Sequence, residues 1–368
     1  MTTTEIRPFR IEIPQAELDD LHSRLANARW PEQLPGDGWS RGVPVEYLRE
    51  LAEYWRDGFD WRAQEARLNT FPQFVTTIDG IDVHFLHARS GNPDALPLLL
   101  THGWPNSVVQ FVELIPQLTE RGFDVVVPHV PGFGFSGKPP ETGFGVAQVG
   151  RMWAELMRRL GYERYGVQGG DLGVYVSQET AKADPDRVVG VHLDSGVGLP
   201  TEDLLPELNE EERGLYDQMQ QWASLGVDHH MLLRHYPQTM AFGWNDSPIG
   251  LLAWLLQKFH EFTFAVPVPD DAIDRDLLLT NISLYWFTQS AGSSSWLMYN
   301  SVKFVWPSGQ KAAPTGLYSG PPGIRRLAEL QNDISQWSTD NPGSGHFIAM
   351  EKPEALAADI ATFFDSLA

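Results

Sequence analysis

The 368-residue sequence contains no cysteine, which excludes disulfide bonds, a cysteine nucleophile and thiolate metal sites. Basic residues are also scarce, because 27 lysines and arginines stand against 48 aspartates and glutamates, for a formal net charge of −21. That balance repels phosphate backbones and anionic membranes, so we expect no nucleic-acid partner.

Long apolar runs are absent as well. No stretch reaches the ~18 apolar residues of a membrane span, and the N-terminal MTTTEIRPFRIEIPQ lacks the apolar core of a signal peptide. We therefore predict a cytoplasmic protein with no membrane span. The sequence also lacks clustered metal-ligand spacings and a glycine-rich dinucleotide loop, so we predict neither a metal nor another cofactor.

What is present is the composition of a folded globular protein, with 42% hydrophobic residues, 13 Trp, 10 Tyr and 19 Phe. Residues 1–73 carry two helical patterns and are predicted to form an N-terminal helical segment that wraps the core. Two alternating strands then meet at the hairpin dipeptide Asp79-Gly80. Apolar strands that alternate with helices fill residues 74–197 and 301–368, which predicts a mostly parallel sheet covered on both faces. Residues 198–300 are helical and rich in aromatics, and are predicted to be an inserted lid.

The segment YGVQGGDLGVYVSQET predicts a strand, a tight turn and a helix, with Asp171 at the centre of the turn. Glycines on both sides of Asp171 permit the strained backbone of a nucleophile elbow, which exposes the central side chain. The following helix directs its N-terminus at the carboxylate and favours its charged form. The alternative is an aspartate that caps an ordinary strand-to-helix turn.

Two further segments stand where an α/β hydrolase needs them. The sequence HGWP, residues 102–105, follows the apolar strand LPLLL. In that loop the backbone N–H of Trp104 would converge with that of Leu172 as an oxyanion hole. His346 lies in a glycine-rich loop before the last helix, which is the chain position of a hydrolase base. A strand-ending turn and a surface histidine are the respective alternatives.

Together these residues resemble the epoxide hydrolases of the microsomal and juvenile-hormone type, which are α/β hydrolases with an extra N-terminal helical segment. The resemblance extends over almost the whole chain, through PFRIEIPQAELDDLHSRLANARWP, HGWP, VPGFGFSGKP, GGDLG, NDSPIGLLAWLLQKF, YWFTQSAGSSSW and SGHFIAMEKPEALAADI. It implies an α/β-hydrolase fold and a small-molecule epoxide as the substrate. It leaves the oligomeric state open, with a homodimer as one alternative.

The resemblance implies a two-step reaction. Asp171 attacks an epoxide carbon to give an alkyl-enzyme ester, and water activated by His346 hydrolyses that ester to a diol. In this family, lid tyrosines donate a proton to the opening alkoxide. The aromatic residues of the lid, with Trp244 and Trp286 as candidate substrate contacts, indicate a bulky apolar or aromatic epoxide, in biosynthesis or detoxification.

The triad acid departs from the family. The family's glutamate position is Gly323 here, and no Asp or Glu occurs between Trp306 and Ala328. A histidine base without a carboxylate loses orientation and charge stabilisation. Asp194, at the end of the strand VVGVHLD, is the candidate for a relocated acid, with a plain turn residue as the alternative.

The lid departs from the family as well. His229 occupies the position of the first lid tyrosine and Met298 that of the second, which makes both candidates for substrate contact. Tyr299, next to Met298, is the stronger candidate for the proton donor, and Tyr236 is the weaker one. For both tyrosines the alternative is a role in packing.

These departures leave three hypotheses open. The leading one is an epoxide hydrolase. The second is a non-hydrolytic enzyme that opens or cyclises an epoxide without activating water. The third is a binding protein on an inactive hydrolase scaffold, against which the retention of both Asp171 and His346 argues. A haloalkane dehalogenase is a minor variant, because Leu172 stands where those enzymes usually carry a tryptophan.

Overall fold

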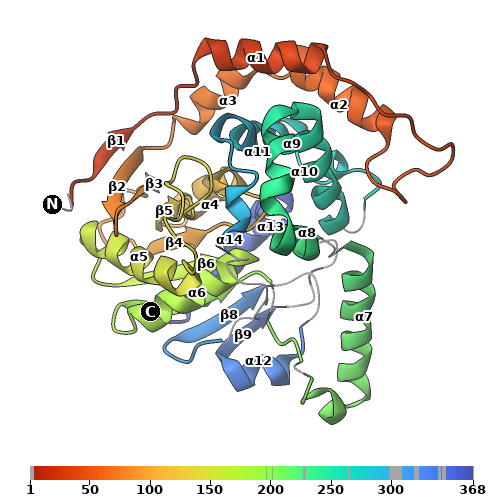
Figure 1. The fold of residues 1–368 in the computed structure, drawn as a ribbon. Helices are drawn as coiled ribbons and strands as arrows, with labels where there is room; N and C mark the ends of the chain where they lie inside the picture. The colour runs from red at the N-terminus through yellow and green to blue at the C-terminus, as the bar shows by residue number, and fades with distance from the viewer. Residues whose placement is uncertain are drawn as a thin grey trace.

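The computed structural model describes residues 4–195, 197–200, 202–226, 229–263, 266–297, 309–318, 323–338, 341 and 345–367, without the side chains of 221–226 (Figure 1). The strands are β1 (Arg7–Phe9), β2 (Gln73–Ile78), β3 (Ile81–Ala88), β4 (Pro97–Thr101), β5 (Asp124–Pro128), β6 (Tyr165–Gly169), β7 (Val188–Leu193), β8 (Pro314–Tyr318) and β9 (Asp333–Ser338). The helices are α1 (Gln15–Ala26), α2 (Val45–Asp57), α3 (Trp61–Leu68), α4 (Leu114–Glu120), α5 (Val146–Arg159), α6 (Leu172–Ala183), α7 (Glu210–Gly226), α8 (His229–His235), α9 (Pro237–Asp246), α10 (Pro248–Phe262), α11 (Arg275–Thr288), α12 (Arg325–Gln331), α13 (Ile348–Glu351) and α14 (Pro353–Asp365). Short 3-10 helices include η1 (Val108–Phe111) and η4 (Ser293–Ser295).

The strands form one sheet in the order β1-β2-β3-β5-β4-β6-β7-β8-β9. The first strands pair antiparallel, and β5, β4, β6, β7, β8 and β9 pair parallel to one another. The predicted hairpin joins β2 to β3, where Asp79 and Gly80 both have positive φ, as the tight turn requires. The predicted α/β architecture is therefore confirmed.

Both faces of the sheet are covered. Every residue of β4 is buried, and alternate side chains point to opposite faces. Leu98 and Leu100 pack with Phe363 of α14, whereas Leu99 belongs to the larger core that includes Met152 of α5. Continuous apolar strands are what a parallel sheet between two helical layers requires.

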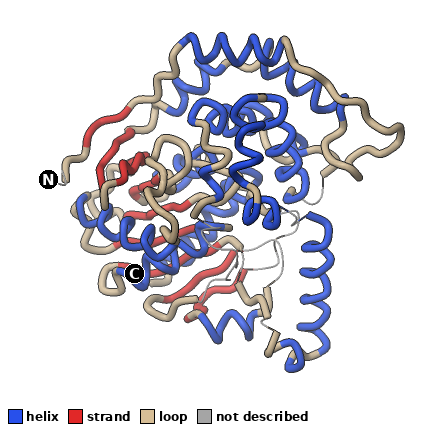
Figure 2. Tube along the Cα trace, in the orientation of Figure 1, coloured by secondary structure: helices blue, strands red, loops and turns tan. Residues whose placement is uncertain are grey.

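The lid helices α9, α10 and α11 lie between the sheet and an arc formed by α1, α2 and α3, whereas α7 lies away from that arc (Figure 1). Figure 2 shows that this region is helical, whereas the strands gather in one layer. Strand β1 joins the sheet, and α1–α3 contact the lid helices α10 and α11. Within the part of the chain that the structure describes, no helix is both long enough and apolar enough to cross a membrane.

Candidate active site

Asp171 lies in the turn between β6 and α6, with φ 52° and ψ −121°. This backbone conformation is rare for a residue with a side chain and is typical of a strained functional turn. The turn also requires a small residue at Gly170, since a Cβ there would lie 1.7 Å from Oδ1 of Asp194. The backbone N–H of Asp171 donates to Oγ of Ser195 at 2.8 Å, which fixes the turn from below.

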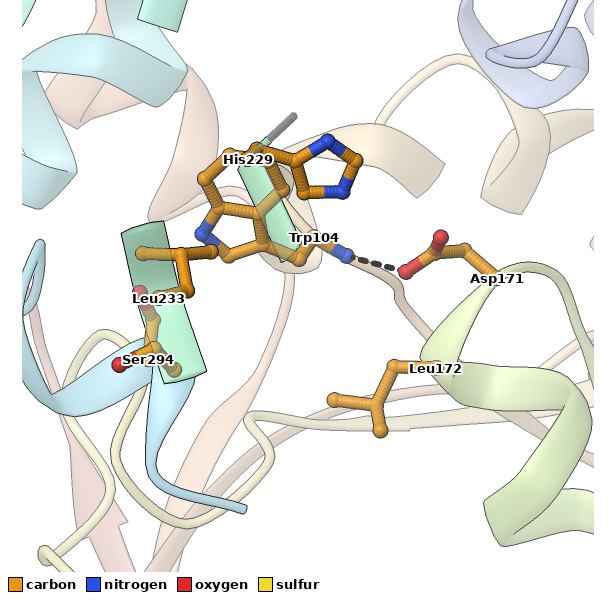
Figure 3. A pocket seen from close by; sticks show the side chains of 7 residues that line it. Trp104, Asp171, Leu172, His229, Leu233 and Ser294 are labelled. Atoms are coloured by element: carbon orange, nitrogen blue, oxygen red, sulfur yellow. Dashed lines mark hydrogen bonds between the residues drawn. The ribbon is translucent and has the colours of Figure 1, made fainter. Parts of the chain in front are cut away.

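The two carboxylate oxygens of Asp171 face different partners. The backbone N–H of Trp104 donates to Oδ1 at 2.9 Å (Figure 3). Oδ2 lies 3.6 Å from Nε2 of His346. Leu172 begins α6 and lines the pocket beside Asp171. The structure therefore brings together Asp171, Trp104, Leu172 and His346, whose catalytic roles stay predictions.

His346 is held in a loop that precedes α13. Its backbone N–H donates to the carbonyl of Phe262 in the lid at 3.1 Å. The carboxylate of Glu351 accepts N–H groups from both neighbours of His346, Gly345 at 2.7 Å and Phe347 at 2.9 Å. Burial lowers the pKa of His346, and the charge of Asp171 opposes that shift. The imidazole is therefore favoured in its neutral form, which is the form that a base needs.

Asp194, the candidate for a relocated acid, lies beside the elbow, since a Cβ at Gly170 would meet its carboxylate. Asp194 is buried, and its Oδ2 accepts from the side-chain amide of Gln168 at 2.9 Å. Burial raises the pKa of Asp194 to about 7, and the nearby charge of Asp171 adds to that effect. Among the described residues, no ion pair or hydrogen bond joins Asp194 to His346. Its role as the triad acid stays a prediction.

Gly323, at the family's glutamate position, is tightly packed. A Cβ at this residue would lie 2.5 Å from the carbonyl oxygen of Val197. No side chain can be placed there without a shift of the backbone. The loss of the usual acid is therefore accompanied by closure of the space that its side chain would need.

The pocket in front of Asp171 is narrow. Its walls are Trp104, Asp171, Leu172, His229, Leu233, Ser294 and Ser295. His229 stacks on the Trp104 ring, with centroids 5.2 Å apart and planes 13° apart. The indole Nε1 of Trp104 is buried without a hydrogen bond among the described residues. Figure 3 shows this nitrogen on the side of Leu233 and Ser294, away from Asp171.

Only some of the predicted lid residues line the pocket. His229 lines the pocket, and its role as a substrate contact stays a prediction. Tyr236 does not, because it is the N-cap of α9 and 60% of its surface is exposed. Trp244 stacks on Trp254 behind Trp104, and Trp286 packs against the guanidinium of Arg24, so neither lines the pocket. Met298 and Tyr299 lie outside the described residues.

Sequence reasoning did not find Leu233, Ser294, Ser295 or Ser195. The run of three serines after α11 is the only one of these signals that stands out in the sequence. Within the described ranges, no three His, Asp or Glu side chains gather as a metal site.

Two family models match the chain: the epoxide hydrolase N terminus over residues 6–111 and the alpha/beta hydrolase fold over residues 97–247. A putative epoxide hydrolase of Stigmatella aurantiaca is 41% identical over 383 aligned residues, which cover 98% of this chain and 85% of that protein.

Two solved structures are similar over the whole chain. Juvenile hormone epoxide hydrolase of the silkworm Bombyx mori superposes with a TM-score of 0.89 at 27% identity, and the match covers 100% of this chain and 95% of that one. The epoxide hydrolase of Aspergillus niger superposes with a TM-score of 0.87 at 30% identity, and the match covers 100% of this chain and 98% of that one. These matches confirm the fold class and the resemblance that the sequence indicates.

Proposed function

Because the chain belongs to the epoxide hydrolase family of α/β hydrolases, we propose that it opens its epoxide through Asp171 and releases a diol by hydrolysis of the resulting ester. The observation that carries this proposal is that the two carboxylate oxygens of Asp171 face different partners. Oδ1 accepts the N–H of Trp104, and Oδ2 faces Nε2 of His346 at 3.6 Å.

In the first step, Oδ2 of Asp171 attacks an epoxide carbon and the ring C–O bond breaks. Oδ1 becomes the carbonyl oxygen of the ester and stays on the Trp104 N–H. A carboxylate suits this displacement because water can cleave the ester that forms, whereas a serine nucleophile would leave a stable ether.

In the second step, the neutral His346 takes a proton from water, which attacks Cγ of Asp171. Negative charge then grows on Oδ1, where the N–H of Trp104, joined by that of Leu172, stabilises it. The diol leaves with the former Oδ2, and the carboxylate is restored with one oxygen from water.

The opening alkoxide needs hydrogen-bond donors on the wall opposite Asp171, because in-line displacement drives the leaving oxygen away from the nucleophile. The indole N–H of Trp104 lies on that side, and His229 stacks on the same ring. We assign both to the stabilisation of the alkoxide, with Tyr299 as the donor of the proton and Met298 as a substrate contact, as the sequence predicts.

The substrate we propose is an apolar or aromatic epoxide. Leu172, Leu233 and the face of Trp104 supply apolar walls around the reacting carboxylate. Such walls favour a substrate whose only polar group is the epoxide oxygen.

A second candidate is an enzyme that opens or cyclises the epoxide without water. It is favoured by the His346 ring, which has no carboxylate within ion-pair distance other than Asp171 among the described residues. Asp194 as a relocated acid is the competing proposal, which keeps hydrolysis.

One single-turnover experiment in 18O-labelled water separates these reactions. We expect the label in Asp171 after hydrolysis of an aryl epoxide, with an unlabelled first-turnover diol, as read by mass spectrometry of the product and of the Asp171 peptide. Label in the first-turnover diol alone would contradict the ester. Release of a free product with no label in either the product or the protein would establish the cyclising reaction. Asp171→Ala is the control and should be inactive.

A further inference from the structure

We propose that the lid helix α11 is a working part of the oxyanion hole, and that Asn281 and Tyr285 are positioning residues that aim the Trp104 N–H at Asp171. This inference rests on the ester mechanism proposed above and extends it to residues that do not line the pocket.

Three buried hydrogen bonds join α11 to the segment after Trp104. The Nδ2 group of Asn281 donates to the carbonyl of Pro105 at 2.8 Å. The hydroxyl of Tyr285 donates to the carbonyl of Asn106 at 2.9 Å. Oγ of Ser107 donates in turn to Oδ1 of Asn281 at 2.7 Å. Three successive loop residues are thereby tied to two side chains one helical turn apart.

The loop needs such partners because it belongs to no strand or helix. It runs from the end of β4 to the start of η1, so the carbonyls of Pro105 and Asn106 have no place in a sheet or helix ladder. Buried carbonyls without a partner are costly. Asn281 and Tyr285 satisfy both, and in doing so they fix the peptide planes after Pro105 and Asn106, in the same short loop as the N–H that faces Asp171.

The opposite side of α11 is anchored elsewhere. Oγ of Ser283 accepts the indole N–H of Trp55, on α2, at 2.9 Å. Ser283 is as buried as Asn281 and lies two residues from it, but it contacts the N-terminal segment rather than the loop. The helix therefore offers a matched control, in which a buried hydrogen bond of α11 is removed without touching the oxyanion hole.

The chemistry predicts which step suffers. In ester formation, the N–H of Trp104 binds an oxygen that is losing negative charge. The orientation of this N–H therefore has little effect on the rate of that step. In ester hydrolysis, charge accumulates on that same oxygen, and the donor stabilises the transition state. A loosened loop should therefore slow hydrolysis more than formation, and the ester should accumulate.

The test compares Asn281→Ala, Tyr285→Phe and the control Ser283→Ala in rapid-quench reactions with an aryl epoxide, with the ester followed by intact mass. We expect the first two variants to hydrolyse the ester ~10-fold or more slowly while formation stays within about threefold. Ser283→Ala should keep the parent ratio of the two rates. Equal slowing of both steps, or identical behaviour of all three variants, would overturn the assignment.

Amide exchange of Trp104, followed by NMR in 15N-tryptophan protein, gives a second readout that needs no turnover. We expect faster exchange in Asn281→Ala and Tyr285→Phe than in Ser283→Ala at matched thermal stability. Unchanged exchange would refute the positioning role. Absence of any ester in the parent enzyme would instead refute the proposed function, and the exchange result would still decide the role of α11. Tyr285→Phe removes one oxygen only, which keeps the test open if Asn281→Ala fails to fold.

Discussion

Asp194 is a buried carboxyl group next to the charged Asp171, and its pKa is raised to about 7. In an unfolded chain an aspartate ionises near pH 4, at about 3.9. Between these values the folded state holds a proton that the unfolded state has lost, so rising pH lowers the free energy of unfolding. The buried Asp194 therefore destabilises the folded state at neutral pH, as groups in functional sites often do.

We expect Asp194→Asn to be more stable than the parent at pH 8, by an amount that shrinks toward pH 5. The pKa values of the folded and unfolded chains differ by about three units, which limits the gain in the free energy of unfolding to about 4 kcal/mol. Urea unfolding at both pH values measures the difference, with the exposed Asp186→Asn as the control. An equal difference at the two pH values would contradict the shifted titration. If Asp194 serves His346, the same variant also accumulates the ester.

The missing acid at Gly323 could be predicted from the sequence alone, but its structural setting could not. The sequence indicates that the usual acid is missing, because a glycine at a motif position is directly visible. It does not indicate that a Cβ there would meet the carbonyl of Val197, since that contact joins two distant segments. Tyr236 failed as a candidate for the same reason: its exposure depends on how α8 and α9 meet.

At the scale of elements, the loop that carries His346 depends on α13. Glu351 accepts N–H groups from the residues on both sides of His346. In Glu351→Gln the amide nitrogen cannot accept, so one of these two bonds is lost. We expect ester hydrolysis to fall about tenfold, because one charged hydrogen bond is worth ~1.5 kcal/mol or more and aims the base.

Pre-steady-state kinetics measures this effect as an accumulated ester with little change in its formation. The exposed Glu354→Gln, one residue into α14, is the matched control and should behave as the parent. A fall in thermal stability without ester accumulation would mean that Glu351 serves the fold alone.

The elements themselves could be predicted well. Alternation of apolar strands with helices identified the sheet, and the Asp79-Gly80 turn fixed the antiparallel edge. The elbow and HGWP loop followed from glycine and chain order. The docking of α11 on that loop could not be predicted, because Asn281 and Tyr285 are separated from it by more than 170 residues and their hydrogen bonds have no sequence signature.

At the scale of the whole molecule, three buried histidines lie close together, namely His84, His129 and His102 of the HGWP loop. Nδ1 of His84 and Nδ1 of His129 are 2.8 Å apart, and Nε2 of His84 faces Oε1 of Gln73 at 2.9 Å. His84 therefore donates to Gln73 and accepts from His129. Burial lowers the pKa of His84 to about 3 and that of His102 to about 4, and it lowers that of His129 well below its usual value.

These shifts predict a loss of stability in mild acid. The unfolded chain protonates the three histidines near pH 6.5, whereas the folded chain does not, so their contribution is fully present above pH 6.5 and is lost as pH falls toward 4. Three protons correspond to about 4 kcal/mol per pH unit at the steepest point. Urea unfolding at pH 7.5, 6.5 and 5.5 tests this, with His22→Gln on the exposed face of α1 as the control. A flat stability between pH 7.5 and 5.5 would contradict it.

The docking of α11 has a consequence for how this scaffold can be altered. A lid is commonly regarded as an exchangeable module that sets specificity, above a core that sets chemistry. On the proposal that α11 positions the Trp104 N–H, that division does not hold here, because the bonds from Asn281 and Tyr285 join the lid to the loop that we assign to hydrolysis. A lid transplanted from a relative would bring a new pocket and, unless α11 stays with its loop, a misaligned oxyanion hole. In a chimaeric protein, α11 and the loop after Trp104 should therefore be exchanged together.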